Sequence, residues 1–262
     1  MFIKKFYMSR KIISYTLYGN DKRYLDPLFE NARNLDKYYP GWIMYVYHDR
    51  TVKAPYLNKL SNLGVILHNV EKSEIPPKLW RYMAVLDQNN EYVIFRDADS
   101  SLSLRESILV NEWIKSEYSY HIMRDHPLHI APIMAGMFGA KKSGFPRISK
   151  IIQNKNLYQL TRSYDYDQVL LADFLYPDIY TESMIHTSFF KFKDEVICKI
   201  DPVDDYIGAI ACDKNASIKE DSLLFKPTPG IPYYLARMLR YRVRPVLYAS
   251  NFYGFLRKII NI

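Results

Sequence analysis

The sequence predicts an α/β protein, with a mostly parallel sheet covered by helices on both faces and a basic C-terminal helical appendage. Runs of β-forming apolar residues alternate with segments of helical spacing through the first hundred residues, as in parallel sheets with crossover helices. The 262 residues are 48% hydrophobic and 24% charged, which suits one large domain with a buried core. Residues 227–232 hold three prolines and one glycine, so we place a boundary between a main domain, 1–226, and an appendage, 227–262.

The first strand covers residues 11–18 (KIISYTLY), which are rich in β-formers and end at the turn signal Gly19-Asn20. Residues 23–38 follow with apolar side chains on one helical face, and Pro40-Gly41 ends that helix. The same alternation continues with a strand at 42–48, a helix at 57–63, a strand at 65–70, a helix that Pro76-Pro77 opens and that runs through Leu86, and a buried strand at 91–96.

Beyond residue 100 the pattern becomes mixed. We expect a helix over residues 103–116, a strand over 118–123 and a short strand between glycines over 135–140. A further helix is predicted over 165–175, and Tyr176-Pro177 is expected to end it, because proline interrupts helical hydrogen bonding.

The strand over residues 91–96 is followed directly by Asp97-Ala98-Asp99. Ligands of parallel sheets bind beyond the carboxyl ends of the strands, which is where this triplet lies. Two carboxylates at this spacing can share one divalent cation, and hard oxygen ligands suit Mg²⁺ or Mn²⁺. Such a cation would bridge to a diphosphate and neutralise the charge on a departing nucleotide. Surface loops also produce Asp-x-Asp by chance, and the preceding strand is what favours a metal site at Asp97 and Asp99.

A wider set of motifs accompanies this triplet: Trp80-Arg81-Tyr82, residues 95–100 (FRDADS), Arg105-Glu106, Asn111-Glu112-Trp113, residues 121–127 (HIMRDHP), residues 132–139 (PIMAGMFG), Asp167-Gln168 and Tyr176-Pro177. Over roughly residues 11–210 the set resembles GT-A (Rossmann-like) glycosyltransferases, in particular a group from surface-polysaccharide loci and large viruses with a family-8-like site layout. The resemblance implies a metal-dependent transferase that moves a sugar from a nucleotide-sugar donor to a glycan or lipid-linked glycan acceptor.

The family-8-like layout implies roles for residues far from the triplet. An Asp-Gln pair at the start of a helix faces the anomeric carbon in that layout, which makes Asp167 and Gln168 the predicted catalytic residues. The alternative for Asp167 is a helix cap. A late histidine completes the metal shell in that layout, so His186 is the predicted third ligand and would favour Mn²⁺. The alternative is a partly buried histidine satisfied by backbone, and the chain lacks the family's His-x-x-Gly-x-x-Lys pattern.

Arg124 and Asp125 follow the strand predicted over residues 118–123 and are expected to face the same cleft. Asp125 is a candidate for holding the hydroxyls of the donor sugar, and Arg124 for binding the donor. The next polar residues, His126 and His129, are candidates for the acceptor. The alternative interpretation is a structural ion pair between Arg124 and Asp125.

Three further residues are candidates for binding the nucleotide. Arg81 lies on the helix before the metal strand and would clamp phosphate oxygens, unless it lies on a solvated helix face. Tyr15 and Tyr18, at the end of the first strand, are candidates for stacking on the base, although strand alternation places at least one tyrosine in the core. Gly136 and Gly139 either let the backbone approach a sugar or mark a bulge.

The net charge of +8 is concentrated at the two ends of the chain. Residues 226–262 hold seven Lys or Arg and no Asp or Glu, so residues 233–262 either bind an anionic membrane surface or pack on the main domain as a basic helix. No nucleic-acid-binding motif occurs, so no nucleic-acid partner is expected. With only two cysteines and no run of about 18 apolar residues, we expect a cytoplasmic protein, peripheral on the inner face of the membrane under the first interpretation.

Two other functions compete with this prediction. A nucleotidyltransferase uses a related fold, but it would carry a Gly-rich phosphate loop after the first strand, and Tyr18-Gly19-Asn20 lacks one. A carbohydrate- or membrane-binding protein on a degenerate transferase fold is the non-enzymatic alternative.

Overall fold

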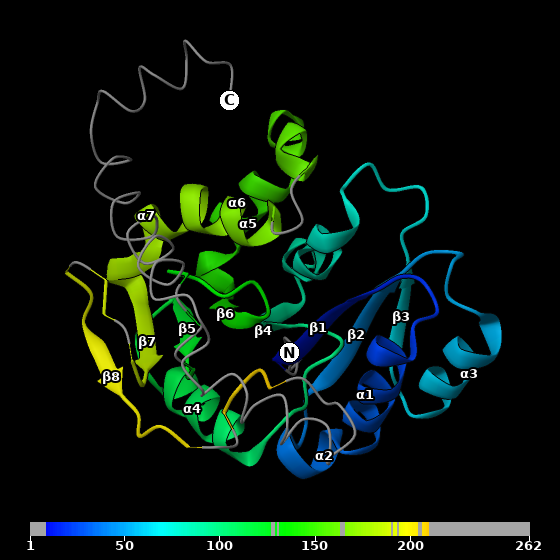
Figure 1. Cartoon of the computed structure of the whole chain (residues 1–262), viewed down its shortest axis with the longest axis horizontal. Helices are drawn as coiled ribbons and strands as arrows, with labels where there is room; N and C mark the ends of the chain where they lie inside the picture. The colour runs from blue at the N-terminus through cyan, green and yellow to red at the C-terminus, as the bar shows by residue number, and fades with distance from the viewer. Residues whose placement is uncertain are drawn as a thin grey trace, which may run out of the picture.

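The computed structural model describes residues 9–126, 129, 131–162, 166–189, 191–192, 194–203 and 206–209. An eight-stranded sheet in the order β3-β2-β1-β4-β6-β5-β7-β8 forms the middle of the molecule (Figure 1). Its strands are β1 (Arg10–Leu17), β2 (Ile43–His48), β3 (Ile66–Asn69), β4 (Asn90–Arg96), β5 (Tyr120–Arg124), β6 (Met137–Lys141), β7 (Ser183–Thr187) and β8 (Ile197–Lys199). β6 pairs antiparallel with β4 and β5, and the other neighbours in this sheet are parallel, which confirms the predicted fold class.

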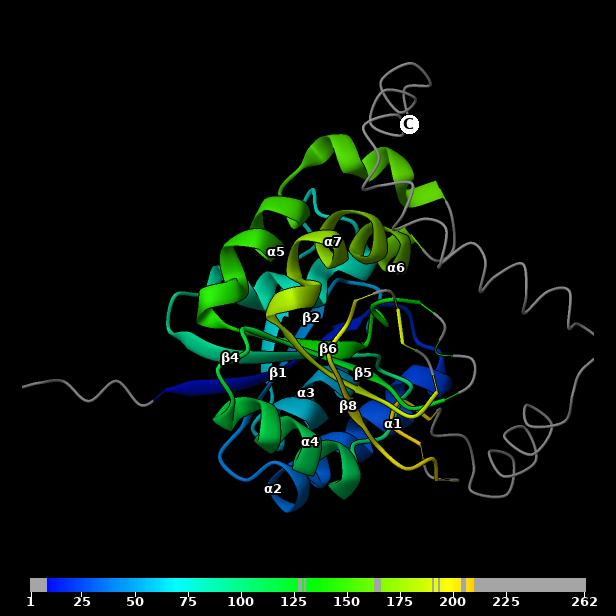
Figure 2. The ribbon, with the colours of Figure 1, turned by 90° about the vertical axis from the view of Figure 1, so that its left-hand side faces the viewer.

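Helices cover both faces of the sheet, which is seen edge-on in Figure 2. On one face lie α1 (Lys22–Arg33), α2 (Leu35–Tyr38), α3 (Ala54–Asn62) and α4 (Leu104–Lys115). On the other lie the 3₁₀ helix η1 (Pro77–Leu86), α5 (Phe145–Ile152), α6 (Tyr166–Leu170), the π-helical segment η4 (Leu171–Leu175) and α7 (Tyr176–Ile179). Shorter 3₁₀ segments are η2 (Lys142–Gly144), η3 (Lys155–Arg162) and η5 (Tyr180–Glu182).

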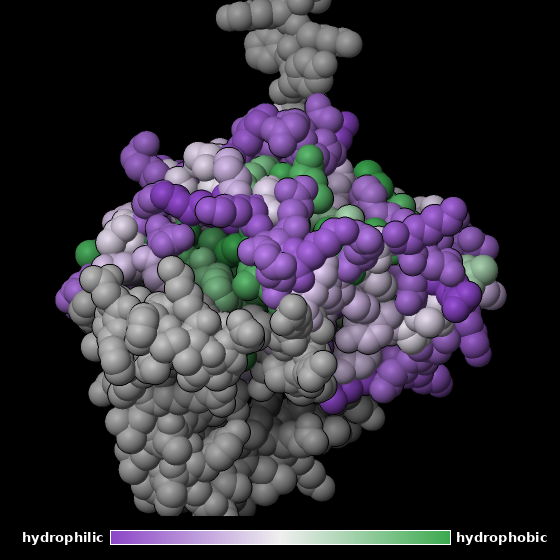
Figure 3. Space-filling model, turned by 90° about the horizontal axis from the view of Figure 1, so that it is seen from above, coloured by the Kyte–Doolittle hydropathy of each residue, from purple (hydrophilic) through white to green (hydrophobic). Residues whose placement is uncertain are grey.

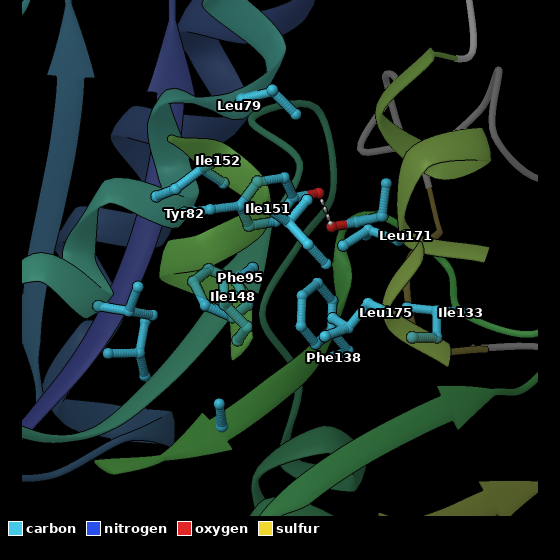
Figure 4. Packing of buried hydrophobic residues seen from close by; sticks show 14 of the residues in the cluster. Leu79, Tyr82, Phe95, Ile133, Phe138, Ile148, Ile151, Ile152, Leu171 and Leu175 are labelled. Carbon is cyan, nitrogen blue, oxygen red and sulfur yellow. Dashed lines mark hydrogen bonds between the residues drawn. The ribbon is translucent and has the colours of Figure 1, made fainter. Parts of the chain in front are cut away.

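The core consists of two apolar clusters, one on each side of the sheet. β1 contributes to both, because successive side chains of a strand point to opposite faces: Ile12 packs beneath η1, and Ile13 packs beneath α1. On the η1 side, the rings of Tyr82 and Phe95 lie 5.0 Å apart and those of Phe95 and Phe138 4.6 Å apart (Figure 4). Burial of these faces is what holds the three layers together.

The helix expected to end at Tyr176-Pro177 continues instead. After a π-helical turn, α7 begins at Tyr176 and carries Pro177 in its first turn. A proline is tolerated there because the first N–H groups of a helix have no intrahelical acceptor. The segment after Pro76 also differs from the prediction, since it forms a 3₁₀ helix rather than an α-helix.

The described surface carries few large apolar groups. In the view from above, most of the described surface is hydrophilic, with an apolar hollow near the middle and smaller apolar patches elsewhere (Figure 3). Within the described ranges, none of the helices has the length and apolar character needed to cross a membrane. The predicted appendage at 227–262 lies outside the described residues, so its membrane contact stays a prediction.

Candidate active site

A cavity of about 270 Å³ opens beyond the carboxyl ends of β1 and β4. It lies where ligands of parallel sheets bind. Its walls are formed by Thr16, Leu17, Tyr18, Tyr24, Lys78, Arg81, Asp97, Ala98, Asp99, Ala135, Asp167 and Gln168. The predicted site residues that the structure brings together here are Tyr18, Arg81, Asp97, Asp99, Asp167 and Gln168.

The end of β4 is anchored beneath the cavity by the buried side chain of Arg96. Its Nη1 donates to the carbonyl oxygen of Gly136 at 2.7 Å, and its Nη2 to Oε2 of Glu106 at 2.8 Å. The hydroxyl of Tyr39 donates to the other oxygen of Glu106 at 2.7 Å. All three side chains are buried, so this network fixes the backbone immediately before Asp97.

The loop that carries the triplet is held from the other side by α1. Asn31 is buried, and its Nδ2 donates to the carbonyl oxygen of Ser100 at 2.7 Å. Its Oδ1 accepts the backbone N–H of Leu102 at 2.9 Å. The hydroxyl of Ser100 donates to the carbonyl of Asp97 at 2.9 Å. One buried amide thus fixes the loop after β4 by pairing with its backbone.

Arg81 lies between two carboxylates of the cavity. Its Nη1 pairs with Oδ1 of Asp97, and its Nη2 with Oδ2 of Asp167 at 2.6 Å. Backbone contacts hold it, since its N–H donates to Oγ1 of Thr16 at 2.8 Å and its carbonyl accepts from the hydroxyl of Ser14 at 2.6 Å. Burial raises the pKa of Asp167, and Arg81 acts in the opposite direction.

Asp99 is paired with a different arginine. Nη2 of Arg23, in the first turn of α1, lies 3.2 Å from Oδ2 of Asp99. Burial and the neighbouring Asp97 raise the pKa of Asp99, whereas Arg23 acts to lower it. Two acidic groups that disfavour each other's charge are stabilised by a shared cation, and each has a second oxygen besides the one in its ion pair. The donor set therefore fits Mg²⁺ or Mn²⁺.

A glycine packs directly against the carboxylate of Asp97. A Cβ added to Gly136 would lie 2.1 Å from Oδ2 of Asp97 and 2.8 Å from its backbone nitrogen. No side chain fits at this position while Asp97 keeps its place. The close approach that Gly136 permits is therefore to Asp97, and the sequence signal for it was the pair of Gly136, just before β6, and Gly139, within β6.

The structure corrects the predicted role of Tyr15. This residue is fully buried in the apolar cluster between the sheet and α1, and its hydroxyl lies 3.5 Å from Nδ2 of Asn31. The prediction that it stacks on a nucleotide base is therefore wrong. Tyr18 is 44% exposed, lines the cavity and packs edge-on against Trp80 at 6.2 Å, so its own prediction remains open.

The roles predicted for Arg124 and Asp125 are also wrong, because both residues are buried away from the cavity. Arg124 donates to both carboxylate oxygens of Glu195, at 2.9 and 2.5 Å. Asp125 accepts two hydrogen bonds from Arg105, at 2.8 and 2.9 Å, one from the hydroxyl of Ser188 at 2.6 Å and one from a backbone N–H at 3.0 Å. Each residue has its own partner, so the alternative of an ion pair between them is wrong too.

The histidines predicted to bind the acceptor are buried as well. The ring of His126 packs 4.2 Å from that of Tyr206, and the ring of His129 packs 5.4 Å from that of His126. Neither residue lines the cavity.

His186 is not a ligand of the same cation as Asp97 and Asp99. It is buried on β7, where its Nδ1 lies 2.8 Å from Nε2 of His121 and its Nε2 lies 3.1 Å from Oε2 of Glu112. Both ring nitrogens therefore have protein partners. In the part of the chain that the structure describes, no group of three or more His, Cys, Asp or Glu side chains is arranged to hold a metal ion.

Sequence reasoning missed several residues of the cavity. Thr16 and Leu17 end β1, Tyr24 lies in the first turn of α1, and Lys78 begins η1. Their common signal is position, since each lies at or just beyond the carboxyl end of a strand or in the helix that follows.

No protein-family model matches the chain, and the comparison with curated proteins gives no match. Among solved structures, S. aureus TarS 1–349 is similar at a TM-score of 0.53 and 14% identity, covering 96% of this chain and 75% of that chain. Glucosyl-3-phosphoglycerate synthase of M. tuberculosis is similar at 0.45 and 9%, covering 90% and 81%. A mycobacterial protein matches at 0.40 and 9% over 52% of this chain, which spans about half (54%) of that protein's length. Together with the strand order, the TarS likeness shows the GT-A type of α/β fold.

Proposed function

We propose that the chain is a metal-dependent glycosyltransferase that moves a sugar from a nucleotide-sugar donor to a glycan or lipid-linked glycan acceptor in surface-polysaccharide synthesis. One observation carries the proposal. Asp97 and Asp99, beyond the end of β4, share one cavity with Asp167 and Gln168 of α6, which begins some seventy residues later. A pair of carboxylates able to bind a metal and a third carboxylate face one cavity where the strand order reverses between β1 and β4. This arrangement suits the transfer of a group from a diphosphate.

In this proposal Asp97 and Asp99 hold Mn²⁺ or Mg²⁺. The cation would neutralise the charge that grows on the diphosphate as the donor bond breaks. Lys78 and Arg81 line the same cavity and add positive charge at its walls. Tyr18, exposed at the rim, is the candidate for contact with the nucleotide base.

Asp167 and Gln168 are the candidates for contact with the transferred sugar. Arg81 holds the carboxylate of Asp167 at 2.6 Å, which fixes its orientation. Burial raises the pKa of Asp167, and the pairing with Arg81 limits that rise. Asp167 is therefore positioned to accept a hydrogen bond from a sugar hydroxyl, with Gln168 beside it as donor and acceptor.

A screen of donors tests this function. The purified full chain is incubated with a panel of nucleotide sugars, with and without Mn²⁺ or Mg²⁺, and released nucleoside diphosphate is measured. We expect cation-dependent release from at least one donor. Asp97→Asn should reduce it at least a hundredfold, because the pair that binds the cation is broken. Asp36→Asn, an exposed aspartate on α2, is the matched control and should leave release unchanged.

The identity of the product separates the competing functions. Pyrophosphate in place of nucleoside diphosphate would assign the chain to the nucleotidyltransferases. No release from any donor, with glycan binding retained, would show a carbohydrate-binding protein without transferase activity.

A further inference from the structure

The two aspartates of the triplet have counter-ions of different kinds. Arg81, the partner of Asp97, has a side chain that is 6% exposed. Arg23, the partner of Asp99, has a side chain that is 48% exposed. The guanidinium of Arg81 is thus part of the buried core, and that of Arg23 lies at the surface beside the cavity.

Arg81 is fixed in place by several contacts. It bridges Asp97 and Asp167, and its backbone is bonded on both sides to β1. Breaking a buried ion pair exposes an uncompensated charge to an apolar environment, which is strongly unfavourable. The buried pair with Asp167, whose side chain is 8% exposed, therefore keeps Arg81 in place beside Asp97, whose own side chain is 50% exposed, whatever binds in the cavity.

Arg23 is held much less firmly. An ion pair with an exposed arginine contributes little, because water competes for the guanidinium. The guanidinium lies over the ring of Tyr24, with Cζ 5.6 Å from the ring centroid, and Tyr24 lines the cavity. Arg23 can thus leave Asp99 and remain beside the space that a ligand would fill.

We propose that Arg23 is a diphosphate-binding residue of this cavity, held on Asp99 until a divalent cation replaces it there. This inference rests on the proposed function, since it assumes a cation at Asp97 and Asp99. Released from Asp99, the guanidinium offers two parallel N–H groups to phosphate oxygens, the geometry that arginine uses for phosphate. The cation and Arg23 then bind the same diphosphate from neighbouring positions.

The exchange couples the two ligands. Before the diphosphate arrives, Arg23 competes with the cation for Asp99 and weakens its binding. After the cation has bound, Arg23 strengthens the binding of the diphosphate. By linkage, each ligand raises the affinity for the other by the same factor, and part of that factor depends on Arg23.

Binding titrations with matched variants test this inference on the full chain. Free Mn²⁺ is measured by electron paramagnetic resonance, and UDP, GDP, CDP, ADP and dTDP are titrated calorimetrically at saturating Mn²⁺. Arg23→Ala should tighten the binding of Mn²⁺ alone about two- to fivefold, as loss of an exposed competing pair predicts. It should weaken the binding of the preferred diphosphate about tenfold, as loss of a charge-assisted hydrogen bond predicts.

Lys22→Ala is the control, because it removes the same charge from the neighbouring exposed position in the same helical turn. It should leave both affinities within about twofold of the wild type, because an exposed lysine that is not paired with Asp99 is screened by solvent and salt. Melting temperatures of both variants establish that they are folded.

Each result decides between the claims. If the wild type binds Mn²⁺ and a diphosphate while Arg23→Ala behaves as Lys22→Ala does, this inference is overturned and the proposed function stands. Weaker Mn²⁺ binding in Arg23→Ala would also overturn it, because Arg23 would then position Asp99 rather than compete for it. If the wild type binds neither ligand, the proposed function fails, and this inference fails with it.

Discussion

Gly136 sets the position of Asp97. Since a Cβ at this position would lie 2.1 Å from Oδ2 of Asp97, any larger residue must displace the carboxylate or the backbone. The carbonyl of the same glycine accepts from the buried Arg96 at 2.7 Å, so the backbone is held on one side. The carboxylate of Asp97 and its backbone nitrogen, 2.8 Å from the added Cβ, are therefore what must move.

We predict that Gly136→Ala weakens the binding of Mn²⁺ at least tenfold, because a misplaced ligand loses roughly the 1.4 kcal/mol or more that corresponds to this factor. Gly139→Ala is the control. Its Cβ would lie 3.0–3.1 Å from Ile94 and Trp113, in the core and away from Asp97, so it should lower the melting temperature but leave Mn²⁺ affinity unchanged. Equal Mn²⁺ affinity in Gly136→Ala and wild type would contradict the role given to this glycine.

Two buried histidines make stability depend on pH. Since the carboxylate of Glu112 can only accept, Nε2 of His186 donates to it, and Nδ1 of His186 accepts from Nε2 of His121. Burial lowers the pKa of His121 well below its usual range, with His186 acting in the same direction. Burial also lowers the pKa of His186, and Glu112 partly offsets this.

The direction of the pH effect follows from these lowered values. The unfolded chain takes up protons near the ordinary histidine pKa of about 6.5, and the folded chain does so only at lower pH. The contribution of the two neutral histidines to the free energy of unfolding should be fully present above about pH 6.5. It should be lost progressively as the pH drops below that value. Urea denaturation from pH 7.5 to 5.0 measures this, and His186→Gln should show a shallower decline. Parallel curves for the two proteins would rule out the histidine pair as the cause.

For the candidate site residues, the sequence identified side chains of suitable chemistry, but it did not show which groups surround them in the fold. Tyr15 and His186 lie on strands of a sheet that is covered on both faces. Only the packing of α1 and α4 shows that their side chains are buried among protein partners and do not line the cavity. Asp97 and Asp99 were predictable as cavity residues because they follow a strand at the edge where ligands bind, whereas Asp167 was predicted from the resemblance to the family-8-like layout.

Among the elements, the end of β5 is fixed by a buried ion pair that spans distant parts of the chain. Glu195, which precedes β8, accepts from Arg124 at 2.9 and 2.5 Å and from the hydroxyl of Tyr176 in α7 at 2.7 Å. The pair joins β5, α7 and the segment before β8. The predicted donor-binding role of Arg124 is wrong because its guanidinium is taken up by Glu195. The local sequence did not indicate this pair, because Glu195 lies 71 residues further along the chain.

We predict that Glu195→Gln lowers the free energy of unfolding by about 3–5 kcal/mol, the effect of leaving one member of a buried pair uncompensated. Glu182→Gln is the matched control, because Glu182 pairs with Arg147 at 2.8 Å at the surface. Its effect should stay below about 1 kcal/mol. Chemical denaturation measures both values. Similar losses of unfolding free energy in the two variants would show that the buried pair contributes no more to stability than the surface pair.

Most elements were predictable from local pattern, whereas their order in the sheet was not. The strands before residue 100 appear within a few residues of their predicted bounds, because β-formers and turn residues mark them locally. The antiparallel direction of β6 and the continuation of the helix through Pro177 depend on tertiary packing, which no local pattern reports.

For the whole molecule, the fold brings together residues that are far apart in the sequence. β1 supplies Thr16, η1 supplies Arg81, the β4 loop supplies Asp97 and Asp99, and α6 supplies Asp167. The likeness to TarS at a TM-score of 0.53 extends over 96% of the chain and shows that the fold is of the GT-A type. The sugar transfer proposed for this protein depends on the metal-binding pair Asp97 and Asp99.

Calorimetric titration of nucleoside diphosphates in the presence of Mn²⁺, on the wild type and on Asp99→Ala, tests that dependence most directly. We predict that one diphosphate binds to the wild type only when Mn²⁺ is present, and that Asp99→Ala abolishes this binding while its melting temperature stays close to that of the wild type. Binding that is equally tight in Asp99→Ala, or that does not depend on the cation, would contradict the assignment of Asp97 and Asp99 as the metal site.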